Sequence, residues 1–290
     1  MSPRSWWHKL GHGSLLLVAT VYCVFPIYFM LVQSLKTAKE DVFGNPFIVV
    51  NPTLENFEGL FERTGVAHGF VGSALRRPYP VIDWLENTIV VFAGSVTLTL
   101  VVSVLAAYAL GRLRPPGARW WRRAIFATYA VPHTILFVPL YQVIVSLRLD
   151  DNLLALLLVY PTLALPFCVW ILSAYFQQLP REVEESALVE GASRLTAFFR
   201  IVLPMSWPVI VAAGIFTLGT IASDFTIASV FLLDAHNQTI PAGLGTMEVA
   251  LDELLAVAGI NLMAIPVVAI CAVFARSYVR GLTAAMVEGA

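Results

Sequence analysis

The chain has 290 residues, of which 58% are hydrophobic and 13% are charged. Soluble domains carry about 25% charged residues, so the composition excludes an ordinary cytosolic enzyme. Its 18 Lys and Arg residues face 19 Asp and Glu residues, which leaves no basic excess to neutralise a phosphate backbone. Nucleic-acid binding is therefore not expected.

Six long apolar runs predict membrane-spanning segments. Each run approaches the roughly 20 residues that a helix needs to cross a hydrocarbon core. Lipid offers no partner to backbone N–H and C=O groups, and the runs are too long and too uniformly apolar for barrel strands, so each should be a helix. The predicted fold is an all-α membrane protein with six transmembrane helices, at residues 14–34, 87–110, 124–146, 153–174, 208–232 and 257–275.

The positive-inside rule predicts the orientation of these spans. With the N-terminus inside, 12 Lys and Arg residues fall in cytoplasmic segments and six fall outside. Both termini are therefore expected in the cytoplasm. The cytoplasmic segments would be 1–13, 111–123, 175–207 and 276–290, and the external loops would be 35–86, expected to hold short surface helices, and 233–256.

The segment Gly111–Arg123 carries five arginines beside Trp120 and Trp121. It reads either as an ordinary cytoplasmic loop that obeys the charge rule or as an anchor for anionic lipid. The sequence leaves both readings open.

No catalytic constellation is visible. The only lysines, Lys9, Lys36 and Lys39, do not follow a glycine, so the chain has no phosphate-binding loop of the P-loop type. The five histidines show no metal-ligand spacing, and no nucleophile elbow occurs. A membrane protein of this kind, with no enzymatic activity, metal or cofactor expected, is a conduit, a carrier or a scaffold.

The most informative segment is residues 179–204, between the fourth and fifth spans. Pro180 suits a first helical position, and Glu182, Glu184 and Glu185 complement the N-terminal end of a helix dipole. Gly191 permits a sharp backbone turn. Two short helices are expected to meet there.

Apolar residues recur at helical spacing along this segment. An apolar stripe at a wet surface favours a partner protein, although the stripe could equally rest on the rim of its own bundle. The stripe consists of Ala187, Leu188, Ala192, Leu195, Phe198 and Phe199.

The spacing of Glu185-Ser-Ala187, Gly191 and Ile201-Val-Leu-Pro204 resembles the EAA signature of permease subunits in ABC importers. In that family the loop docks into a groove on a separate ATPase subunit. The resemblance implies an ATPase-coupling set of Glu185, Ser186, Ala187, Leu188, Gly191, Ala192, Leu195, Phe198 and Pro204.

Further stretches resemble the second, maltose-type permease of carbohydrate importers; they are Ser34-Leu-Lys-Thr37, Thr53-Leu-Glu-Asn-Phe57, Ala106-Ala-Tyr-Ala-Leu110, Val138-Pro-Leu-Tyr141 and the tail Gly281–Gly289. The resemblance implies a type I importer bundle in a bacterial or archaeal cell membrane. It also implies a second permease, two ATP-binding subunits that hold ATP and Mg²⁺, and an external solute-binding protein. The sequence departs from the family pattern at Ser186, at Glu190 and at Glu288, which reverses a charge usual in the tail.

Asp224 is the one acidic residue well inside a predicted span. With Thr217 and Thr220 it follows a spacing of i, i+3 and i+7, which on a continuous helix gives a polar stripe. The stripe could line the solute path or bond a neighbouring helix. His133, next to Pro132, could also line the path, or its side chain could bond the carbonyl group that the proline leaves free one turn back.

Two other classes of function compete with the importer reading. An ion-driven secondary carrier usually shows inverted repeats with broken spans in both halves, and the sequence shows no such symmetry. A membrane scaffold would dock a cytosolic partner without a polar stripe inside its spans. Co-purification of an ATPase would separate the importer from both.

Overall fold

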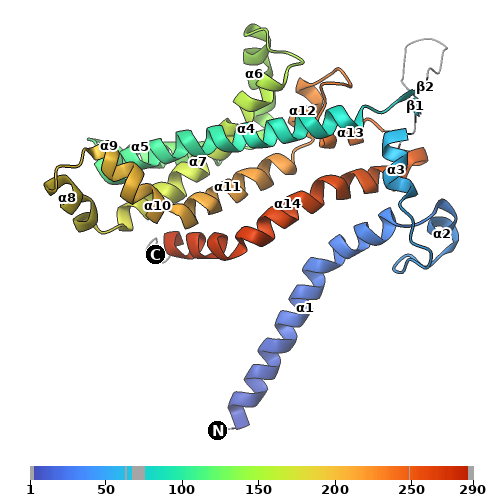
Figure 1. Cartoon of the computed structure of the whole chain (residues 1–290), viewed down its shortest axis with the longest axis horizontal. Coiled ribbons are helices and arrows are strands. Elements are labelled where there is room, and N and C mark those ends of the chain that lie inside the picture. The colour runs from blue at the N-terminus through green and yellow to red at the C-terminus, as the bar shows by residue number, and fades with distance from the viewer. Residues whose placement is uncertain (1–2, 63, 67–75, 248, 287–290) are drawn as a thin grey trace. The chain divides into compact units, whose positions relative to one another are not determined.

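The computed structural model describes residues 3–62, 64–66, 76–247 and 249–286 (Figure 1). The chain divides into two compact units. The first comprises residues 1–81 and 246–264, and the second comprises residues 82–245 and 265–290. The long helix α14 (Val249–Met286) contributes to both units.

The first unit begins with the long helix α1 (Pro3–Ser34). The segment expected to hold short surface helices contains α2 (Ala38–Phe43) and α3 (Glu55–Glu62). It also contains two three-residue antiparallel strands, β1 (Thr64–Val66) and β2 (Arg76–Pro78), which the sequence did not predict.

Buried polar side chains hold the turn that follows α1. Lys36 is fully buried, and its ammonium group donates to the Pro46 carbonyl oxygen at 3.1 Å. The Asn56 amide donates to the carbonyl oxygens of Ser34 and Lys36 at 2.9 and 2.7 Å. Because unpaired polar groups are costly to bury, these bonds fix the segment around α2 and α3 against the end of α1.

The second unit is a bundle around α7 (Leu153–Gln178). Of the helices long enough to span a membrane, α7 has the most buried apolar stretch, and it contacts α5, α6, α11 and α12. Helices α8 and α9 lie at one end of this unit, and α12 and α13 lie at the other (Figure 1). The remaining elements are α4 (Val81–Tyr108), η1 (Ala109–Leu113), α5 (Ala118–Thr128), α6 (His133–Ser146), α8 (Arg181–Val189), α9 (Arg194–Ala197), η2 (Phe198–Val202), α10 (Leu203–Met205), α11 (Trp207–Ala222), α12 (Thr226–Phe231) and α13 (Ile240–Gly245).

Four helical stretches in the described part of the chain are long and apolar enough to cross a membrane, namely Gly13–Ser34, Val81–Leu113, Leu153–Gln178 and Glu253–Gly281. A fifth is obtained if Arg194–Met205 and Trp207–Ala222, which meet at a bend of 72°, count as one broken span. The chain is therefore a multi-pass α-helical membrane protein, and the count of six spans stays a prediction.

The predicted single helix over 124–146 is divided in the structure. Helix α5 ends at Thr128 and α6 begins at His133. Pro132 has no N–H for a helical bond, and its ring disfavours helical geometry at Val131. Hydropathy alone does not register this break, because the residues on both sides of it are apolar.

The predicted helix over 208–232 is also interrupted. Helix α11 ends at Ala222 and α12 begins at Thr226. The Asp224 carboxylate accepts the backbone N–H groups of Ile227 and Ala228 at 3.3 and 3.1 Å, as an N-terminal cap does. The acidic residue therefore starts a new helix.

Gly111 lets η1 approach α7 closely. A Cβ atom at Gly111 would lie 2.7 Å from the Ser173 carbonyl oxygen and 3.2 Å from Phe176 Cβ. A backbone oxygen cannot rotate away as a side chain can, so the two segments would have to separate.

We therefore expect Gly111→Ala to lower the free energy of unfolding by about 1–3 kcal/mol, as overpacking does. Gly219→Ala in α11 is the matched control, because a Cβ atom there meets nothing within 4 Å. That control should be neutral or stabilising by up to about 1 kcal/mol. Chemical denaturation of both variants in detergent measures the difference, and equal stabilities would show that the close approach is unimportant.

Candidate coupling site

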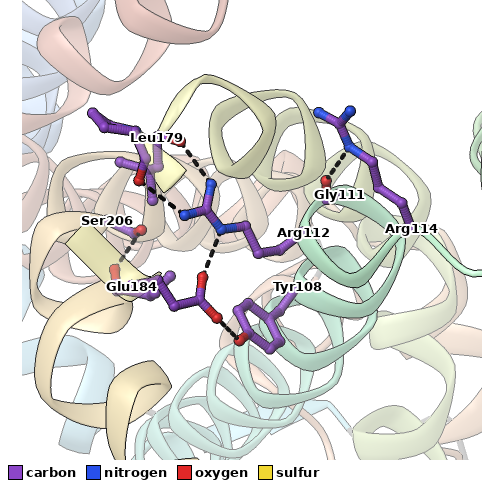
Figure 2. A network of polar contacts seen from close by, with 9 residues as sticks. Tyr108, Gly111, Arg112, Arg114, Leu179, Glu184 and Ser206 are labelled. Carbon is purple, nitrogen blue, oxygen red and sulfur yellow. Dashed lines mark hydrogen bonds and ion pairs between the residues drawn. The ribbon is translucent and has the colours of Figure 1, made fainter. Parts of the chain in front are cut away.

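One buried ion pair ties α8 to η1. Arg112 Nε donates to Glu184 at 2.6 Å, and both side chains are 8% exposed. The other carboxylate oxygen of Glu184 accepts the Tyr108 hydroxyl at 2.7 Å. Figure 2 shows the carboxylate between the guanidinium group and the phenol ring.

The guanidinium group of Arg112 also holds the chain that enters α8. Its terminal nitrogens donate to the carbonyl oxygens of Leu179 at 2.6 Å and Pro180 at 2.9 Å. All three guanidinium nitrogens therefore bond the stretch from the end of α7 into α8. We call the three side chains Tyr108, Arg112 and Glu184 the latch.

The latch keeps Glu184 ionised. Burial alone would raise the pKa of this carboxyl, but the hydrogen bonds from Arg112 and Tyr108 and the positive charge of Arg112 outweigh burial and lower it. A lowered pKa in the folded state stabilises the fold above the ordinary carboxyl pKa. This stabilisation is lost as the pH falls through the lowered value.

The turn at Gly191 follows from a helix C-terminal motif. Gly191 has φ of +92°, in the region that favours glycine. Its N–H bonds the Leu188 carbonyl at 3.1 Å, and the Ala192 N–H bonds the Ala187 carbonyl at 2.9 Å, the two bonds of a Schellman motif. Ser193 then caps α9 by accepting the Thr196 N–H at 3.2 Å. The expected pair of short helices meeting at Gly191 is confirmed.

The predicted coupling residues differ in exposure. Leu195 is 69% exposed, and Glu185, Ser186, Gly191 and Pro204 are also exposed. Half-buried positions are Ala187, Leu188 and Ala192. The most exposed apolar side chain of α8, Val189 at 88%, is one that the stripe did not include.

Phe198 corrects the predicted stripe. It is 3% exposed and packs in the core cluster with Tyr108 and Phe176, its ring centroid 4.6 Å from that of Tyr108. A π-helical turn begins at Phe198, in which the Leu203 N–H bonds the Phe198 carbonyl. Phe198 and the next residue are about 100° apart around the helix axis, so Phe198 points inward while Phe199 is 58% exposed. Phe198 anchors the segment to the bundle.

The segment from α8 to α10, which we call the arm, joins α11 at the 72° bend. Ser206, between the two helices, is fully buried, and its hydroxyl donates to the Val202 carbonyl at 2.7 Å. Pro208, at the second position of α11, has no N–H to continue the helix from the arm.

An open apolar groove lies beside the arm. It is lined by Phe199 and Pro204 of the arm, by Trp207 of α11 and by residues of α4. The arm is thus fixed at Glu184 and at Phe198, and it leaves the bundle between these points.

The predicted solute-path residues do not form one stripe. Thr217 is fully buried and donates to the Ala213 carbonyl at 2.8 Å, and it lies 3.4 Å from Cys168 Sγ of α7. Thr220 is half-buried and donates to the Phe216 carbonyl at 2.9 Å. Because α11 ends before Asp224, the assumed helical spacing does not apply.

Asp224 is bonded within the chain. Besides capping α12, it accepts the Tyr160 hydroxyl at 3.0 Å and remains half-buried. The alternative of bonding a neighbouring helix is therefore realised in the structure. His133 is the first residue of α6, and its side chain lies outside the described part of the structure.

The sequence reading missed the latch. It assigned Glu184 only to the helix dipole and counted Arg112 only among the basic loop residues. No local signal links them, because 72 positions separate the pair along the chain. The absence of any acidic residue between Glu86 and Asp150 was the one available hint, since the arginines of that stretch need distant partners.

Comparison with known proteins decides the family. Residues 100–283 match the family described as "Binding-protein-dependent transport system inner membrane component". The chain belongs to this family. The arm of this permease lies wholly inside the matched region, as does the latch.

Relatives agree over nearly the full length. The permease is 30% identical to the inner membrane ABC transporter permease protein YcjP of Escherichia coli, over 97% of each chain. It is 29% identical to the trehalose/maltose transport system permease protein MalG of Thermococcus litoralis, over 94% of each chain. A crystal structure of a bacterial ABC transporter that imports alginate contains a chain with the same fold, with a TM-score of 0.73 at 18% identity, covering 95% of this chain and 98% of that one. The permease is a non-catalytic transport subunit of the cell membrane.

Breaking the latch should destabilise the arm. Glu184→Ala leaves the buried guanidinium group of Arg112 without its carboxylate partner, so we expect the free energy of unfolding to fall by about 3 kcal/mol. Glu185→Ala, one position along and exposed, is the matched control and should change it by no more than about 0.5 kcal/mol. Chemical denaturation in detergent gives both values.

A double-mutant cycle with Arg112→Ala assigns the loss to the pair. The coupling energy should be about 1–3 kcal/mol. Additive effects of the two substitutions would contradict the latch.

Proposed function

We propose that this permease is the second membrane subunit of an ATP-driven carbohydrate importer. It would pair with a different permease, two ATP-binding subunits and an external solute-binding protein. The chain would hold no cofactor itself, because ATP and Mg²⁺ would be bound by the ATPase subunits. In this arrangement the chain crosses the membrane six times and keeps both termini in the cytoplasm.

The observation that carries the proposal is the arm. It is anchored at both sides by buried contacts, yet it presents exposed apolar side chains at Val189 and Leu195. The two positions lie on adjacent helices of the arm, and contiguous exposed apolar surface is typical of a site that another protein covers. The matched spacing of the EAA signature falls on this same arm.

The proposed mechanism is mechanical. When ATP closes the two ATPase subunits, the groove that holds the arm moves, and the arm moves with it. The latch and Phe198 pass this motion to α4 and α7, and the bend before α11 passes it to the next span. The bundle then exchanges between inward-open and outward-open states, because rigid elements joined by packed interfaces move as bodies.

The carbohydrate class rests on the functions of related proteins, namely trehalose/maltose transport and alginate import. For the solute path we propose the break between α11 and α12. There Thr220 and Asp224 are half-buried, and the backbone is irregular. Irregular backbone inside a membrane is tolerated where it is buried in protein or lines a water-filled cavity. We also propose His133, the first residue of α6, for the solute path.

Binding measurements on the cognate external protein would identify the solute.

Gly191→Val tests the coupling role. A β-branched residue resists a φ of +92°, so the turn between α8 and α9 should change while the membrane spans stay intact. A Cβ atom at this position meets nothing within 4 Å, so steric clash is not a second cause. We expect uptake by the reconstituted transporter to fall at least about tenfold, a loss of roughly 1.4 kcal/mol of coupling, while the subunit still inserts.

Gly191→Asn is the matched control, because asparagine tolerates positive φ. It should keep most of the uptake. Equal uptake by Gly191→Val and the unmodified transporter, at equal membrane levels, would contradict the coupling role.

A further inference from the structure

The second half of the arginine-rich segment 111–123 is helical in the structure, as part of α5 (Ala118–Thr128). Helix α5 carries Arg119, Arg122 and Arg123 at spacings of three and four residues, which places the three side chains on one helical face. Arg114, just before the helix, adds a fourth charge. We call these four arginines the basic face. The basic face lies at the same end of the second unit as the arm, because Arg112, two residues before Arg114, bonds Glu184 of α8.

No described carboxylate neutralises the basic face. The described ion pairs of the chain join Arg112 to Glu184 and His236 to Asp83, and neither includes a residue of this face. The half-buried guanidinium of Arg122 has a lowered pKa, first because of burial and then because of repulsion by Arg114, Arg119 and Arg123. An anion held at this face would relieve the repulsion.

Two exposed tryptophans lie between Arg119 and Arg122 along α5. Trp120 and Trp121 are 65% and 54% exposed, with ring centroids 5.2 Å apart. Indole rings favour the boundary between water and hydrocarbon, where they sit at the level of lipid headgroups. A site that bound an acidic soluble protein would need the arginines, but it would not need two adjacent exposed tryptophans beside them.

Helix α5 is also fixed to the bundle. Ala118 is buried, and the Phe126 ring packs on Trp170 of α7 with centroids 4.9 Å apart. The helix therefore presents the charges and the indole rings on a rigid element that contacts η1, at the end of the candidate span Val81–Leu113.

We infer that α5 is a binding site for the phosphate headgroups of anionic phospholipids, with the basic face holding the phosphates and Trp120 and Trp121 entering the interface. Arginine matches phosphate oxygens in paired hydrogen bonds, and clusters of basic residues beside a span bind anionic lipid. The inference needs only that this end of the bundle lies at a membrane surface. It does not depend on how the arm meets an ATPase.

The test compares two variants that each remove two positive charges. Arg119→Gln/Arg123→Gln weakens the basic face, and Arg276→Gln/Arg280→Gln on α14 is the matched control, with all four positions exposed. The full transporter is purified and titrated with phosphatidylglycerol or phosphatidylcholine, and bound lipid is counted by native mass spectrometry. We expect phosphatidylglycerol affinity to fall at least about tenfold in the α5 variant, with no change in the control or for phosphatidylcholine.

Three further measurements sharpen the result. Arg119→Lys/Arg123→Lys should keep much of the affinity, and Trp120→Ala should reduce it. Soluble glycerol phosphate separates a headgroup site from a simple phosphate site, because it should not displace the lipid. Equal phosphatidylglycerol binding by the two glutamine variants would overturn the inference. So would displacement by glycerol phosphate, or loss of ATPase-subunit binding in the α5 variant with lipid binding unchanged, which would indicate an acidic protein partner.

Discussion

The coupling arm depends on one buried carboxylate. Glu184 receives Arg112 at 2.6 Å and Tyr108 at 2.7 Å, and the same arginine bonds the carbonyl groups that lead into α8. Without this pair, α8 would lose its described side-chain hydrogen bonds to α4 and η1. With it, a helix that projects from the end of the bundle is fixed to η1 and α4, and force applied to the helix reaches the membrane-spanning part.

The arm combines rigid attachment with an exposed face. Phe198 and Glu184 are buried at its two roots, while Leu195 and Val189 are open to solvent. The Schellman turn at Gly191 sets the angle between the two short helices without bonds to the rest of the chain. Different side chains therefore anchor the arm and remain available to a partner protein, as a segment that transmits motion between two proteins requires.

The sequence was sufficient for the fold class and for the position of the arm, because both depend on local properties. Apolar runs predict segments that lie in lipid, and Gly191 indicates a backbone turn with positive φ. The breaks after Thr128 and Ala222 were missed because the apolar residues around Pro132 and Asp224 keep the average hydropathy of each segment high. The burial of Phe198 was missed because it depends on tertiary packing against Tyr108 and Phe176, which are distant in sequence. The latch depends on tertiary contact between distant residues, which no single-sequence pattern encodes.

The central claim is that the arm of this permease is held by its own bundle at the roots and by an ATPase subunit at the tip. A photo-cross-linking residue placed at Leu195, and in a separate sample at Phe198, tests it in the complex reconstituted with its purified ATPase. The account predicts that the probe at Leu195 captures the ATPase subunit, whereas the probe at Phe198 reacts only within its own chain. Capture by Leu195 of its own chain alone would contradict the account.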